Sequence, residues 1–163
     1  MEIIYNNNKQ ISKSNDDFLK ISETQKKPEI KLDVDKTKTY LLIMYDPDAV
    51  LGTHIHWILS NIKNNNINTG IDLIKYKGPA PPPHSGKHRY IFELYEQKIP
   101  HLNPIEERII TIEKLRDKLD VNQPINKIQF ISQNESGGRR RKTKKRKNKK
   151  RKTKRKNISN NII

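Results

Sequence analysis

The sequence contains no cysteine among its 163 residues, so disulfide bonds and thiolate metal ligands are excluded. Long apolar runs are also lacking, since only 32% of the residues are hydrophobic and no stretch approaches the length of a transmembrane helix. The N-terminus has an early acid, Glu2, with no basic region and no apolar stretch long enough for a signal peptide. We therefore expect a soluble intracellular protein, cytoplasmic or nuclear.

The net charge of +16 comes almost entirely from one end of the chain. Of the 34 lysine and arginine residues, 15 lie between Arg139 and Lys156, where there is no acid, and the remaining 19 are balanced by 18 acidic residues. Two modules are therefore expected. Residues 1–136 are long enough to form one domain with a sizeable core, whereas residues 137–163, the basic tail, should be disordered because they have nothing to bury.

The basic tail has several possible partners. Dense positive charge without aromatic residues is typical of segments that contact nucleic-acid backbones or acidic membrane surfaces without reading a sequence. It would serve equally as a nuclear import signal, or as a solvated tail without function. The candidate contact residues are Arg139, Arg140, Arg141, Lys142, Lys144, Lys145, Arg146 and Lys147. The bias toward Asn, Ile and Lys, together with this tail, is similar to that of proteins of large DNA viruses of protists, which predicts a viral source and a place in the virion.

Short β-branched and aromatic segments, separated by turn residues, dominate the folded part. They predict strands within 3–5, 29–34, 40–45, 54–62, 71–76, 88–96 and 127–131. The strand over 40–45 is apolar on both faces and should be central, whereas residues 9–27 are polar and predict a loop-rich connection. Helical spacing of apolar residues predicts one helix within 105–119. The pattern indicates an all-β fold with minor helices, an antiparallel two-sheet sandwich.

A proline-rich loop, residues 78–86, runs directly into one of these strands. Proline has a fixed φ and no N–H, so the loop should be stiff and cannot join a sheet ladder until Gly86 lets the backbone turn. Alternation then places four residues on one face of the strand, namely His88, Tyr90, Phe92 and Leu94. A few polar groups at the edge of an apolar wall, beneath a rigid loop, are typical of a ligand pocket.

Two earlier segments supply further polar side chains. Asp46 ends the strand over 40–45, where it is either a turn-forming cap or a site residue. In the next strand, alternation predicts that His56 lies on the face opposite Trp57.

Three motifs, in one order along the chain, resemble the phosphatidylethanolamine-binding protein family. They are Asp46-Pro47-Asp48-Ala49, then His56-Trp57, then Gly78-Pro79-Ala80-Pro81-Pro82 leading to His88-Arg89-Tyr90. The resemblance implies a large antiparallel sheet packed on a smaller one, with a small pocket for a phosphate-type anion or a phospholipid head group. It implies that the pocket is formed by Asp46, His56, Pro81, Pro82, His88 and Tyr90. It also implies a kinase or protease as protein partner, as for some relatives.

The chemistry of these side chains fits an anion. Histidine charges readily beside an anion, so His56 and His88 are expected to donate charge-assisted hydrogen bonds, with the Tyr90 hydroxyl as a further donor. Asp46 would repel a phosphate, so its expected role is to orient an imidazole. The departures from the family pattern are Val50 in a position that is often proline and Ala80 where many members have glycine.

The triad of a serine hydrolase could also be formed by Ser85, His88 and Asp46. A nucleophile elbow requires a glycine two residues before the serine, and Ser85 has none there. We therefore expect Ser85 to be a loop residue whose hydroxyl bonds to its own backbone. The chain is therefore predicted to be a monomeric binding protein and not an enzyme, with no cofactor. A pocket-based regulatory module and a nucleic-acid packaging or targeting protein acting through the tail stay open as compatible hypotheses.

Two other interpretations concern charged and metal-binding groups. His54, His56 and His88 could hold a metal, but three histidines without cysteine are a weak signal. We therefore expect no metal site. Arg89 should point away from the pocket and pair with an acid such as Glu93.

Overall fold

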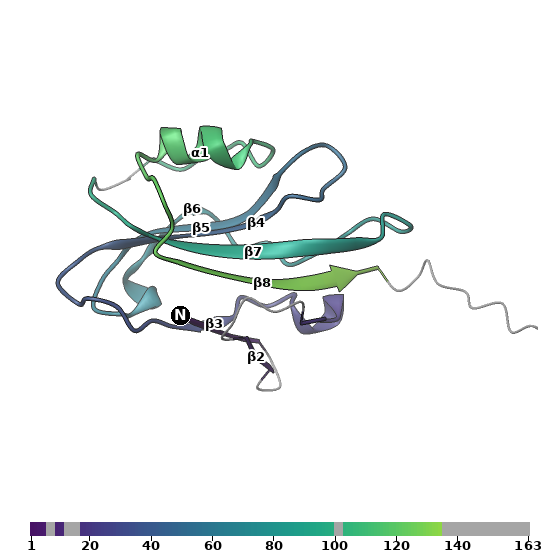
Figure 1. Ribbon diagram of the computed structural model, residues 1–163, viewed down its shortest axis with the longest axis horizontal. Helices are drawn as coiled ribbons and strands as arrows, with labels where there is room; N and C mark the ends of the chain where they lie inside the picture. Colours follow the sequence, from purple (N-terminus) through teal and green to yellow (C-terminus); the bar gives the residue numbers. More distant parts are fainter. Residues whose placement is uncertain (6–8, 12–16, 100–102, 135–163) are drawn as a thin grey trace, which may run out of the picture.

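The computed structural model describes residues 1–5, 9–11, 17–99 and 103–134, which form two antiparallel sheets and one short helix (Figure 1). The smaller sheet has the order β2-β1-β3 and consists of β1 (Glu2–Tyr5), β2 (Lys9–Ile11) and β3 (Glu29–Lys31). The larger sheet has the order β6-β5-β4-β7-β8 and consists of β4 (Tyr40–Asp46), β5 (His54–Ile62), β6 (Ile71–Ile74), β7 (Lys87–Glu96) and β8 (Asn126–Gln133). The predicted two-sheet architecture is confirmed. The predicted disorder of the basic tail concerns residues outside the described ranges.

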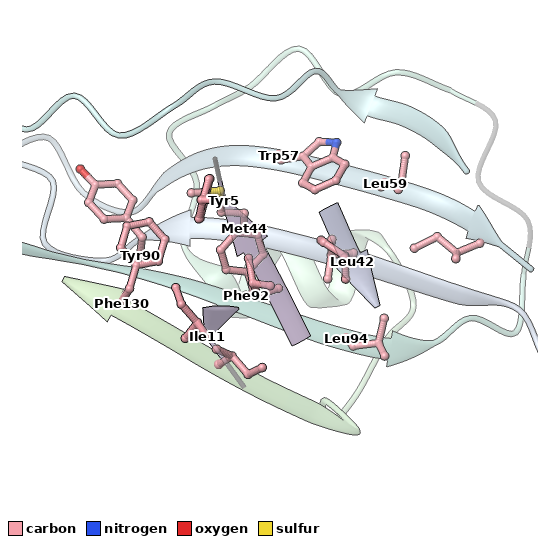
Figure 2. Packing of buried hydrophobic residues seen from close by; sticks show 14 of the residues in the cluster. Tyr5, Ile11, Leu42, Met44, Trp57, Leu59, Tyr90, Phe92, Leu94 and Phe130 are labelled. Carbon is pink, nitrogen blue, oxygen red and sulfur yellow. The ribbon is translucent and has the colours of Figure 1, made fainter. Parts of the chain in front are cut away.

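Both faces of the larger sheet are covered, by the smaller sheet on one side and by α1 (Ile112–Lys118) on the other (Figure 1). Every residue of β4 is buried, and its side chains pack alternately into two different hydrophobic cores. Leu42 and Met44 pack with side chains of the smaller sheet (Figure 2), while Leu41 and Ile43 pack toward α1. The prediction of a central strand over 40–45, apolar on both faces, is therefore confirmed.

The helix prediction over 105–119 is right only in its second half. The backbone before α1 pairs with β5 instead, because Ile55 N donates to Arg108 O at 2.7 Å and Ile110 N donates to Thr53 O at 3.2 Å. An extended segment held in this way cannot continue a helix, so α1 begins after Thr111, its N-cap. Within the described ranges no helix is long and apolar enough to cross a membrane.

The loop prediction over 9–27 is wrong for its first residues, which form β2. The three residues of β2 have too little pattern to be recognised alone. Their conformation depends on pairing with β1, in which Ile11 lies opposite Ile3 and both side chains are buried. Residues 21–23 form a short 3-10 turn in the same connection.

The proline-rich loop is held by its carbonyl oxygens. Because its prolines have no N–H, the carbonyls are their only backbone hydrogen-bonding groups. Pro79 O accepts from Gln25 Nε2 at 2.9 Å, and Pro81 O accepts from Asn134 Nδ2 at 3.2 Å. Gly86 then turns the chain into β7 with a φ of 85°, a value that favours glycine. The loop is therefore a fixed wall beside the start of β7.

Candidate functional site

A pocket of about 450 Å³ opens at one end of the strands of the larger sheet, where β4 ends and β5 and β7 begin. The structure brings together at this pocket all six residues that the family resemblance implies, namely Asp46, His56, Pro81, Pro82, His88 and Tyr90. The strands place the polar side chains, and the proline-rich loop forms one wall. That these residues bind a ligand stays a prediction.

Asp46 both caps its turn and orients a histidine. Its Oδ1 accepts from Asp48 N at 2.8 Å, and its Oδ2 lies 2.7 Å from His88 Nδ1. Both side chains are buried, and a carboxylate accepts, so His88 Nδ1 is the donor. Asp46 is therefore the turn-forming cap, and its role as a site residue stays a prediction that its place in the pocket lining permits.

Ser85 completes a row of hydrogen bonds that resembles a hydrolase triad. Its Oγ lies 2.8 Å from His88 Nε2, on the opposite side of the imidazole from Asp46. However, Ser85 Oγ also lies 2.8 Å from the carbonyl oxygen of Pro82, to which its hydroxyl can donate. Ser85 also lies outside the set of residues that line the pocket. The arrangement therefore fixes the loop and does not present a nucleophile to the pocket.

We accordingly expect no ester hydrolysis beyond background from the intact protein, because Ser85 lies outside the pocket lining and its hydroxyl is held beside the loop carbonyl of Pro82. The measurement is the release of p-nitrophenol from p-nitrophenyl acetate by the wild type and by Ser85→Ala. Equal, background-level rates are expected. Turnover in the wild type that disappears in Ser85→Ala would overturn the assignment.

His56 lies on the same side of β5 as Trp57, so the alternation prediction is wrong here. Met44 pairs with Trp57 whereas Tyr45 pairs with Ile55, which makes His56 the extra residue of a β-bulge. The bulge turns the His56 ring toward the pocket, where its centroid lies 5.1 Å from that of Tyr90.

His56 offers the pocket an acceptor instead of the charged donor expected from the sequence. Its Nδ1 lies 2.7 Å from the carbonyl oxygen of Lys77, and a carbonyl has no hydrogen, so Nδ1 donates. Burial, helped by the nearby His54, Lys77 and Arg108, lowers the pKa of His56 to about 4 despite this hydrogen bond. At neutral pH the imidazole is therefore uncharged, and Nε2 carries a lone pair.

The Tyr90 hydroxyl is buried at the pocket and makes no hydrogen bond of ordinary geometry. Burial raises its pKa well above the usual value, the nearby Asp46 carboxylate acts in the same direction, and the Ala80 backbone lowers the pKa in part. The ring itself is fixed by stacking on Phe130 at a centroid distance of 5.3 Å (Figure 2). A buried hydroxyl left without any hydrogen bond costs about 1–3 kcal/mol, and a ligand would give Tyr90 a better partner than its neighbours do.

The sequence patterns missed the rim of the pocket. Val50 and Leu51 are 74% and 78% exposed and, with Ile109, line its mouth. Arg108 donates to Ile55 O at 3.0 Å and to Lys75 O at 2.9 Å, and so ties β5 to the segment after β6. The rim could have been recognised from the two apolar residues directly after the Asp-Pro-Asp-Ala turn. No local sequence pattern marked Arg108.

Among the described residues, no group of three or more His, Asp or Glu side chains is placed to hold a metal.

Arg89 pairs with Asp48, and the predicted pairing with Glu93 is wrong. Its Nε and Nη2 lie 2.9 and 2.8 Å from the two carboxylate oxygens of Asp48. Residues four apart face each other on a helix, but on a strand they are separated by roughly 13 Å. Glu93 instead accepts from Arg116 and Lys127, at 2.8 and 3.1 Å.

Comparison with known proteins agrees with the family resemblance. The family model described as Phosphatidylethanolamine-binding protein matches residues 6–136. Protein SELF-PRUNING of Solanum lycopersicum is 28% identical over 152 residues, which cover 86% of this chain and 85% of that protein.

Solved structures share the fold. A carboxypeptidase Y inhibitor, solved in complex with its cognate proteinase, has a TM-score of 0.68 at 20% identity and covers 81% of each chain. A phosphatidylethanolamine-binding protein from Plasmodium vivax has a TM-score of 0.66 at 18% identity, with 81% of this chain and 83% of that one covered. The match over residues 6–136 extends across most of the sequence, and the chain therefore belongs to the phosphatidylethanolamine-binding protein family.

Proposed function

We propose that the protein is a non-enzymatic binding protein whose pocket takes a phosphate-type anion, free or as part of a phospholipid head group. The observation that carries this proposal is the buried hydroxyl of Tyr90, a residue that lines the pocket, because this hydroxyl makes no well-formed hydrogen bond. Lys77 also lines the pocket and adds positive charge, while the carboxylate of Asp46 is turned to His88. The name of the family supports a phospholipid head group.

The rim of the pocket favours a ligand with an apolar part. The exposed side chains of Val50, Leu51 and Ile109 surround a polar floor, which fits a charged head group attached to an apolar remainder.

The function proposed for the protein in the cell is the regulation of a protease or a kinase. The similar inhibitor structure, solved with its proteinase, supports this direction.

Tyr90→Phe is expected to lower the affinity for phosphate about tenfold, the equivalent of one hydrogen bond, without lowering the stability of the fold. Stability should hold because the variant removes only a hydroxyl that makes no well-formed hydrogen bond in the free protein. Binding is measured by calorimetry with inorganic phosphate and with vesicles of phosphatidylethanolamine, and stability by urea unfolding.

Tyr40→Phe is the matched control. The Tyr40 hydroxyl donates to Asp35 O at 2.9 Å, away from the pocket, so its loss should cost about 1 kcal/mol of stability and no affinity. If Tyr90→Phe binds both probes as the wild type does, the proposed pocket chemistry is wrong. Binding of vesicles without binding of inorganic phosphate would restrict the ligand to the lipid.

A second candidate function belongs to the basic tail. The concentration of 15 lysine and arginine residues between Arg139 and Lys156 favours non-specific binding to nucleic acid or to an acidic membrane surface. This function is compatible with ligand binding in the pocket, because the six pocket residues all lie in the domain before the tail.

A further inference from the structure

The turn between β4 and β5, residues 47–53, carries the two most exposed large apolar side chains of the described part of the chain. Val50 is 74% exposed and Leu51 is 78% exposed, whereas the other large apolar residues there reach at most 53%. Ile109, at the same pocket mouth, lies next to Gly52 of the turn. Single exposed apolar side chains are ordinary on a protein surface, but a group around the mouth of a pocket marks an interaction surface.

The turn is held at its base and closed at its tip. Asp48 accepts from the backbone N and the Nε of Arg89, each at 2.9 Å, and from Nη2 of the same residue at 2.8 Å. Gly52 N donates to Ala49 O at 3.0 Å, and the φ of 107° at Gly52 favours glycine. The apolar tip is therefore a preorganised projection, which loses little conformational entropy when a partner covers it.

The basic tail leaves the domain at the same end of the larger sheet. Gln133, the last residue of β8, pairs with Lys87, the first residue of β7 (Figure 1). Asn134 then donates to the carbonyl oxygen of Pro81, a residue of the pocket wall, at 3.2 Å. Arg139, where the run of basic residues begins, is five residues further along the chain. Five residues span at most roughly 18 Å, so the charge of the tail is tethered close to the pocket.

The folded domain has positive charge at this end as well. Lys77, which lines the pocket, and Lys87 are both exposed, while Asp46 and Asp48 are already paired with a histidine and an arginine of β7. An apolar projection surrounded by cations fits an anionic lipid bilayer, in which the apolar side chains enter the acyl region and the cations meet the head groups. Duplex DNA would match the charge but would offer nothing to the apolar turn.

We propose that the pocket end of the domain docks on an anionic membrane surface, with Val50 and Leu51 inserted into the bilayer and the basic tail on the head groups. The inference deepens the proposed function and rests on it only for the occupant of the pocket, which would open onto the lipid head groups. Two apolar side chains bind a bilayer weakly, and charge alone is screened by salt. Joined in one chain and directed at one surface, the two contacts reinforce each other.

The orientation is tested with a tryptophan placed at the turn of the full chain. Leu51→Trp is mixed with vesicles of phosphatidylcholine and phosphatidylserine whose acyl chains are brominated and therefore quench tryptophan fluorescence on contact. Ile125→Trp is the matched control, because Ile125 is half-exposed at the opposite end of the sheet, where its N donates to Leu94 O. Trp57 is completely buried and gives both variants the same background. Strong quenching is expected for Leu51→Trp and little for Ile125→Trp.

The contribution of the turn to affinity is measured by sedimentation with the same lipids without bromine. Val50→Ser together with Leu51→Ser should weaken vesicle binding by about ten- to a hundredfold, the equivalent of burying one such side chain. Ile99→Ser together with Ile125→Ser removes two half-exposed side chains from the other end of the sheet and should bind as the wild type does. Omitting phosphatidylserine should weaken binding by every variant, because the tail then has no anionic partner.

Selective quenching of Leu51→Trp supports the inference. Equal quenching of both tryptophan variants, or quenching of neither, overturns it. If calorimetry still detects binding of inorganic phosphate in that case, the proposed function stands and the apolar turn is left for a protein partner. Selective quenching that persists when Leu51→Trp is combined with Tyr90→Phe, in a chain whose wild type binds no inorganic phosphate, would support docking and contradict the proposed pocket function.

Discussion

Glu93→Ala is expected to lower the free energy of unfolding by about 3–5 kcal/mol, the usual cost of removing one partner from a buried ion pair. Glu93 is completely buried on the face of β7 that packs against α1. It accepts from Arg116 at 2.8 Å, from Tyr45 at 2.9 Å and from Tyr95. The substitution would leave two buried tyrosine hydroxyls without an acceptor and would remove the ion pair between β7 and Arg116 of α1.

Glu96→Ala on the same strand is the matched control. Glu96 pairs with Lys38 at 2.8 Å, but both side chains are substantially exposed, so its loss should cost about 0–1 kcal/mol. Stability is measured by urea unfolding, and phosphate binding should be unchanged in both variants because neither residue lines the pocket. The prediction is wrong if the two substitutions cost the same.

The same carboxylate gives the stability a defined pH dependence. Burial alone would raise the pKa of Glu93, but hydrogen bonds from Tyr95, Arg116, Tyr45 and Lys127 outweigh it and hold the pKa below its ordinary value. The stabilisation is therefore complete above the pKa of the unfolded chain and is lost as the pH falls through the lower folded value. The difference between the wild type and Glu93→Ala should shrink in acid accordingly.

The strands of the larger sheet were predictable because each carries its own pattern. The apolar run over 40–45 and the alternation of His88, Tyr90, Phe92 and Leu94 depend only on local sequence and burial. The boundary of α1 was not predictable from periodicity, because the pairing of residues 108–110 with β5 overrides it. Where the local sequence pattern fits both a helix and an extended segment, pairing with a distant strand therefore decides which of the two forms.

Six residues of the candidate site were predictable from motifs, but the apolar rim and the chemistry of the polar groups were not. The bulge at His56 exists only in the register between β4 and β5, which no single segment encodes. The donor and acceptor roles of the ring depend on the carbonyl of Lys77, 21 residues further along the chain. The partner of Glu93 likewise lies 23 residues away, at Arg116.

Truncation after Ser136 is expected to abolish binding to duplex DNA while leaving the folded domain intact. The removed residues carry all but about one unit of the excess positive charge, and the truncation point lies beyond β8, which ends at Gln133. For the intact chain, the logarithm of the association constant should fall with the logarithm of salt concentration with a slope of roughly −0.9 per phosphate neutralised. With six to ten contacts, affinity drops by about 10³–10⁵ between 50 and 200 mM salt.

The comparison requires the intact chain, the truncated chain and a third protein in which residues 139–156 keep their composition in scrambled order. Binding to backbone phosphates depends on charge density alone, so the scrambled chain should bind DNA as tightly as the intact one and with the same salt slope. Fluorescence anisotropy on duplexes of two unrelated sequences provides the measurement, and melting temperature and phosphate affinity verify the domain. DNA binding by the truncated chain at full strength would place the nucleic-acid contact in the domain. Loss of binding on scrambling would show that the order of the basic residues is read, which a purely electrostatic contact cannot do.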